Sequence, residues 1–60
     1  MTTKHMYEIF AKEFPWFVPN VVKYQANRKE GGIDIFLDSH STLNFQLSRT
    51  GWILKRGRER

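Results

Sequence analysis

The side chains in this sequence that could carry out acid–base chemistry are few and widely spaced. His5 and His40 lie in different parts of the chain, with no carboxylates at metal-ligand spacing near them. Asp34 and Asp38 share one face of an expected strand, but at ~3.3 Å per residue they lie about 13 Å apart. That separation is too large for a catalytic carboxylate pair. We therefore predict no enzyme activity, no metal site and no cofactor.

Positive charge gathers at the end of the chain. Residues 55 to 60 carry four positive charges and one negative charge, whereas residues 1 to 54 carry six basic and five acidic side chains. An arginine fork donates two parallel hydrogen bonds to a phosphate. A nucleic-acid site is therefore predicted at Arg49, Lys55, Arg56, Arg58 and Arg60. The alternative is a solvated tail that only keeps the protein soluble.

The elements that would position these residues begin with a helix over residues 3 to 14. Apolar residues recur there at three- and four-residue spacing, at Met6, Ile9, Phe10 and Phe14. Thr2 or Thr3 can cap its start, and Pro15 disfavours helical geometry at the residue before it. Residues 16 to 20 contain a second proline and are predicted to form an extended connector that turns into a sheet.

Three stretches then alternate apolar and polar residues, at 21–27, 33–38 and 42–48. The inward positions are predicted to be Val22, Tyr24, Ala26, Ile33, Ile35, Leu37, Leu43, Phe45 and Leu47. A four-residue loop, 28–31, pairs Ala26 with Ile33 and gives Gly31 a positive φ. A three-residue loop, 39–41, places Leu37 opposite Leu43.

The last turn allows two registers. A three-residue loop with Gly51 in a bulge pairs Leu47 with Ile53 and turns Ile53 inward. Trp52 and Leu54 then point to the outer face. A two-residue loop would instead make Trp52 and Leu54 core residues. We predict the bulge, because Arg49 and Thr50 do not suit a mirror-image two-residue turn.

An apolar outer face predicts a second kind of partner. In the bulge register Phe36, Trp52 and Leu54 form a patch rimmed by uncharged polar residues, which is typical of a protein interface. A chain of 60 residues buries only about 60% of its unfolded surface. Pairing through this patch as a homodimer would therefore stabilise it.

Together these patterns predict an α+β fold, with one N-terminal helix packed on a small antiparallel meander of three to four strands. Residues 1–56 form a single small domain and residues 57–60 a basic, disordered tail. The predicted function is a small non-enzymatic nucleic-acid-binding protein. The alternative is a protein-interaction module, such as a small regulator or inhibitor, including one of phage or mobile-element origin. The absence of cysteine and of a long apolar run predicts a cytoplasmic chain with no membrane partner.

Overall fold

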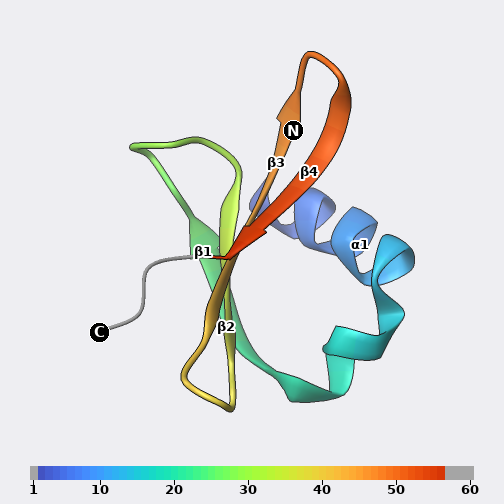
Figure 1. Cartoon of the computed structure of the whole chain (residues 1–60), viewed down its shortest axis with the longest axis vertical. Helices are drawn as coiled ribbons and strands as arrows, with labels where there is room; N and C mark the ends of the chain where they lie inside the picture. The colour runs from blue at the N-terminus through green and yellow to red at the C-terminus, as the bar shows by residue number, and fades with distance from the viewer. Residues whose placement is uncertain (1, 57–60) are drawn as a thin grey trace.

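The computed structural model describes residues 2–56 and shows one helix packed against a four-stranded antiparallel sheet (Figure 1). The predicted α+β fold with a small meander is confirmed. Its strands are hydrogen-bonded in the order β1-β2-β3-β4. The elements in chain order are α1 (Thr3–Glu13), the 3-10 helix η1 (Pro15–Asn20), β1 (Val21–Ala26), β2 (Ile33–Leu37), β3 (Thr42–Ser48) and β4 (Gly51–Arg56). The tail at 57–60 lies outside the described residues.

The helix α1 begins and ends close to its predicted bounds. The Thr2 hydroxyl oxygen accepts a hydrogen bond from the His5 amide at 3.1 Å, which satisfies one of the free N–H groups of the first turn. At the other end, the Phe14 amide donates to the Phe10 carbonyl at 2.8 Å. The helix stops there because Pro15 follows.

The connector after α1 is the first correction. It is not extended but forms the 3-10 helix η1 over Pro15–Asn20, which curls from the end of α1 toward β1 (Figure 1). A proline ring holds φ near −65°, which lies within the range of a 3-10 helix. The Phe17 amide donates to the Phe14 carbonyl at 3.1 Å and closes the first of its turns.

The β1–β2 hairpin has the predicted register. Ala26 pairs with Ile33 and Tyr24 with Ile35, around the four-residue loop 28–31. Gly31 has the predicted positive φ, at 90°, and Gly32 has another, at 72°. The pairing is irregular only near its other end, where a shift between Val21 and Lys23 marks a bulge.

The bulge changes which valine faces the core. Val21 packs against the buried cluster, whereas Val22 is 66% exposed. The predicted inward position of Val22 is therefore wrong, because an extra residue in one strand shifts the alternation of side chains.

The β2–β3 turn has the predicted length but lies one position earlier. The Leu37 amide donates to the Ser41 carbonyl at 2.9 Å, so the loop holds residues 38–40, and His40 has a positive φ of 67°. Leu43 therefore pairs with Ile35 and not with Leu37. A loop of the same odd length keeps the same side chains on each face, so this error leaves the core unchanged.

The last turn contradicts the predicted bulge. Ser48 pairs with Gly51 and Leu47 with Trp52, so the loop has two residues, Arg49 and Thr50. The Ser48 hydroxyl stabilises it by accepting from the Thr50 amide at 3.2 Å and donating to the Gly51 carbonyl at 2.8 Å. In this hairpin Gly51 has a positive φ, at 122°, and the two loop residues do not.

The register of this turn decides which β4 side chains belong to the core. Trp52 and Leu54 lie on the face toward α1, here called the inner face, and both pack against the buried cluster. Ile53 lies on the opposite, outer face. The predicted inward position of Ile53 and outward positions of Trp52 and Leu54 are wrong, since a one-residue change in register exchanges the two faces.

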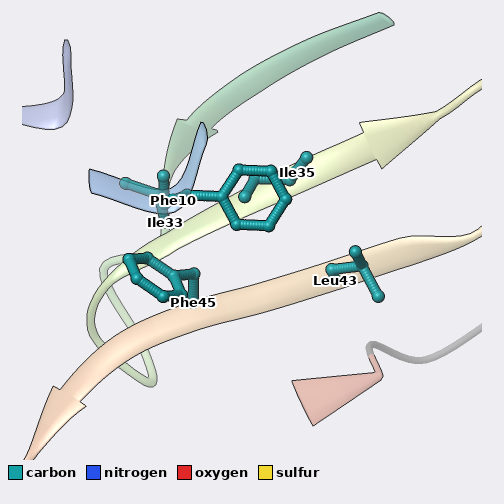
Figure 2. Close-up of a cluster of buried hydrophobic side chains, with 5 residues drawn as sticks. All are labelled: Phe10, Ile33, Ile35, Leu43 and Phe45. Carbon is teal, nitrogen blue, oxygen red and sulfur yellow. The ribbon is translucent and has the colours of Figure 1, made fainter. Parts of the chain in front are cut away.

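The core lies between α1 and the middle two strands. Figure 2 shows the Phe10 ring of α1 over side chains of β2 and β3. Five buried apolar residues make up this cluster: Phe10, Ile33, Ile35, Leu43 and Phe45.

Candidate protein-interaction surface

The helix covers one half of the inner face. Of the strands, β1 and β2 have the most extensive contacts with α1. Tyr7 of α1 stacks on Tyr24 of β1, with ring centroids 4.2 Å apart and planes 5° from parallel. The helix thus has its main strand contacts with β1 and β2, and its Phe10 ring also reaches Phe45 of β3, with centroids 5.6 Å apart.

On β3 and β4, the inner face is contacted mainly by single aromatic rings, and β3 is better buried than β4. Phe14, at the end of α1, meets Phe45 of β3 edge-to-face, with centroids 6.1 Å apart. Trp52 of β4 stacks on the same Phe45 ring, at 4.7 Å and 3°. Leu47 pairs with Trp52 across the two strands but is 58% exposed, although it lies on the inner face.

Trp16 of η1 extends this set of aromatic side chains. Its ring meets that of Phe14 edge-to-face, with centroids 5.7 Å apart. Trp16 as a whole residue is 66% exposed. The contacts thus run without a break from Trp16 through Phe14 and Phe45 to Trp52. We call the exposed and half-buried apolar side chains along this row the apolar surface, which consists of Trp16, Leu47, Trp52 and Leu54.

Phe36 does not belong to the apolar surface. It lies on the outer face, where the Lys23 ammonium sits 5.1 Å from the centroid of its ring. The sheet therefore separates Phe36 from Trp52 and Leu54, and the patch expected from these three residues does not exist as one surface. Their role in binding a partner stays a prediction.

The predicted phosphate contacts are only partly brought together. Arg49 lies in the β3–β4 turn, whereas Lys55 and Arg56 lie at the other end of β4. The four strand steps from Gly51 to Lys55, at ~3.3 Å each, put Lys55 about 13 Å from the turn that holds Arg49. Arg58 and Arg60 lie outside the described residues.

Two basic residues that were not predicted as site residues lie in a loop that contacts Lys55. The β1–β2 loop folds over the outer face, and its Glu30 carboxylate meets the Lys55 ammonium at 3.8 Å. The same loop carries Arg28 and Lys29, which are both exposed. These two residues were not predicted as site residues, because their position depends on how the loop curls and not on any local pattern. We call these two residues and Lys55 the cationic end, which consists of Arg28, Lys29 and Lys55. Arg56 lies on the inner face, across the sheet from this loop.

A polar network holds the loop in place. The Asn44 side-chain amide, almost fully buried, donates to the Gly31 carbonyl at 3.3 Å and to Asp34 Oδ1 at 3.1 Å. The Asn27 amide donates to both Asp34 oxygens, at 3.1 and 3.2 Å. The Asp34 carboxylate is thus engaged in structural hydrogen bonds, which is a poor arrangement for a general base.

The remaining candidate acid–base groups serve the fold or lie in solvent. Asp38 accepts a hydrogen bond from the Asn20 side-chain amide at 3.1 Å. His5 and His40 are both exposed. Between residues 2 and 56, no cluster of three or more potential ligands could hold a metal ion. Within that same range, no helix has both the length and the apolar character needed to cross a membrane.

Comparison with known proteins adds no assignment. No protein-family model, no curated protein and no solved structure matches this chain. The case for a function therefore rests on the apolar surface and the cationic end.

Proposed function

We propose that this chain is a non-enzymatic protein-interaction module that binds its partner through the apolar surface. The observation that carries the proposal is the exposure of Leu47 and Trp16, at 58% and 66%, on either side of a row of packed rings. Apolar patches of this kind mark binding sites on small soluble domains. The cysteine-free composition fits a cytoplasmic module.

The composition of the surface supports a protein partner. Tryptophan is enriched among the side chains that contribute most to binding at protein interfaces, since it offers a large rigid area. Both tryptophans of the chain belong to this surface. Trp52 is held in place by stacking on the fully buried Phe45, so little side-chain entropy remains to be lost on binding.

The test uses a displayed library of random peptides, selected against the wild-type chain. Peptides that bind should lose about tenfold or more in affinity for a Leu47→Ser, Trp16→Ser double variant, because truncating an interface anchor costs over 1 kcal/mol. Calorimetric titration measures the affinities. The matched control is Val22→Ser, which removes an equally exposed side chain from β1.

Two results would contradict the proposal. One is a library that yields no peptide with a measurable dissociation constant. The other is a set of peptides that bind the double variant and the wild-type chain equally well, since their site would then lie elsewhere.

A second candidate function is nucleic-acid binding, and the Lys55–Glu30 contact is the observation that favours it. This contact joins Lys55 to a loop that also carries two exposed basic residues, Arg28 and Lys29. The chain continues from there with Arg58 and Arg60. Their phosphate contacts would be largely independent of base sequence and would weaken with salt as counterions are released.

The cationic end is tested by titrating labelled duplex and single-stranded oligonucleotides at low and moderate salt. An Arg28→Ser, Lys29→Ser double variant should weaken binding, and the slope of log affinity against log salt should fall by about two. Lys4→Ser, Lys12→Ser is the control, because it removes the same charge from α1. No binding by the wild-type chain at low salt, where attraction is strongest, would exclude this function.

A further inference from the structure

The two free edges of the sheet differ in how well they resist pairing with another strand. The β1 edge carries a bulge between Val21 and Lys23, a charged side chain at Lys23, and a proline just before it at Pro19. All three are features that protect sheet edges. The β4 edge pairs with β3 in unbroken register from Gly51 to Arg56 and contains no proline. Only its two terminal charges protect it.

The hydrogen-bonding groups that β4 leaves free can be assigned from its register. Ser48 and Gly51 close a two-residue turn, so they form a hydrogen-bonded pair. Pairs of this kind alternate along antiparallel strands. Gly51, Ile53 and Lys55 therefore direct their backbone groups to β3. Trp52, Leu54 and Arg56 direct their N–H and C=O groups outward, to the side of β4 on which no strand of residues 2–56 pairs.

We propose that β4 pairs with β4 of a second copy of this chain, antiparallel and about a two-fold axis at Ile53. The proposal rests on the proposed function and deepens it, since it names the partner of Trp52 and Leu54. The two sheets then join into one continuous sheet with both helices on the same face.

The charges of β4 select this arrangement over a parallel one. Lys55 and Arg56 stand at one end of the strand, and residues 51–54 are uncharged. In a parallel pair these cations would lie beside those of the second copy, and like charges directly opposite each other destabilise a sheet. The antiparallel register places Lys55 opposite Gly51 of the second copy and Arg56 opposite Thr50.

The same register matches the apolar side chains. With Ile53 on the axis, Trp52 lies opposite Leu54 of the second copy, and Leu54 opposite Trp52, all on the inner face. An aromatic ring paired with an aliphatic side chain is a favourable cross-strand neighbour. No charged residue of β4 thus meets another charged one, so the strand complements itself. An acidic strand from another protein is the competing occupant, and the experiment distinguishes it.

The experiment introduces a positive or a negative charge at Ile53. Sedimentation velocity from micromolar to millimolar concentration then measures the assembly of each variant. The wild-type chain should sediment as a dimer at the higher concentrations. Ile53→Lys and Ile53→Glu should each shift to the monomer, because each puts like charges opposite each other on the axis. An equimolar mixture of the two should return to the dimer. Val22→Lys, at the other edge, is the control and should leave the wild-type dimer unchanged.

A backbone variant tests the same contact without altering a side chain. N-methylation of the Leu54 amide in a synthetic chain removes one outward donor and should abolish the dimer. N-methylation of Ala26 is its control. Ala26 faces the free side of β1, because its neighbour Asn27 donates to the Gly32 carbonyl at 3.0 Å. A proton–nitrogen correlation spectrum of each variant verifies that it is folded.

Three outcomes would overturn the second-copy proposal. They are a wild-type monomer at millimolar concentration, a mixture of folded Ile53 variants that stays monomeric, and a dimer that survives methylation at Leu54. A monomer that binds an acidic extended peptide through β4 would assign the edge to another protein. None of these outcomes tests Trp16 and Leu47, the most exposed residues of the apolar surface, because both lie off β4. The Leu47→Ser, Trp16→Ser variant should lose peptide binding and still form the dimer.

Discussion

The two halves of the inner sheet face contrast sharply in how they are covered. The helix α1 has its main strand contacts with β1 and β2, whereas on β3 and β4 the inner face is contacted mainly by single aromatic rings. The reason is geometric. A helix with its side chains is about 10 Å wide and strands lie ~4.8 Å apart, so one helix covers about two of the four strands. Part of the apolar inner face of the sheet is therefore left uncovered by the helix.

The largest expected effect is a difference in stability between substitutions at two residues of one strand. Phe45 and Leu47 are two positions apart on the inner face of β3, but Phe45 is fully buried and Leu47 is 58% exposed. Phe45→Ala should lower the free energy of unfolding by about 3–5 kcal/mol, since it leaves a cavity. Leu47→Ala should change it by less than about 1 kcal/mol. Urea denaturation measures both. Equal losses would mean that Leu47 is covered as well as Phe45.

A smaller effect is expected at the glycines of the two outer hairpins. Gly32 and Gly51 both have positive φ, at 72° and 122°. A Cβ on Gly32 would overlap the Phe45 carbonyl oxygen and the Gln46 Cβ, whereas a Cβ on Gly51 would meet nothing within 4 Å. Gly51→Ala should therefore cost about 1 kcal/mol from its backbone alone. Gly32→Ala should cost about 2 kcal/mol or more, because steric overlap is added.

The control for the glycine comparison is D-alanine at position 51 in a synthetic chain. D-residues favour positive φ, so this substitution should be close to neutral or stabilising in thermal unfolding. A full loss of stability with D-alanine would show that something other than φ requires glycine in the β3–β4 turn.

The polar network on the outer face gives a third test. Asn44→Ala removes the amide that links the β1–β2 loop to β3, and it leaves the Gly31 carbonyl without that donor. The expected loss is about 1–3 kcal/mol, the cost of an unsatisfied buried group. Hydrogen exchange should become faster in residues 28–32. Gln25→Ala, an exposed neighbour of Asp34 across β1 and β2, should change stability by less than about 0.5 kcal/mol.

The smallest expected effect is the change of folding stability with pH that Tyr7 of α1 causes. Burial, and then the neighbouring Tyr24, raise the pKa of Tyr7 above its ordinary value. A raised pKa in the folded state gives stability that is present below the unfolded pKa and is lost as pH rises past it. Wild-type stability should therefore fall above about pH 10. Tyr7→Phe should fall less over the same range in urea titrations, and an equal fall would contradict the assignment to Tyr7.

Local patterns were sufficient for the elements of this protein and for most of its core. Three- and four-residue spacing located α1, and period-two alternation located three strands with the correct inward residues except Val22. The β2–β3 turn lies one residue earlier than predicted. The predicted inward residues are still correct, because the odd length of the loop keeps the parity of the alternation. These features depend on side chains close in sequence, so the sequence alone contains them.

The apolar surface and the cationic end depended on tertiary structure. The inner position of Trp52 follows from the two-residue turn, which the hydrogen bonds of the Ser48 hydroxyl stabilise. The contact of Glu30 with Lys55 comes from a loop that folds over a strand distant in sequence. Residue spacing predicts which side chains alternate. Which face a helix covers, and which strand edge stays open, follows only when all elements compete for the same limited core.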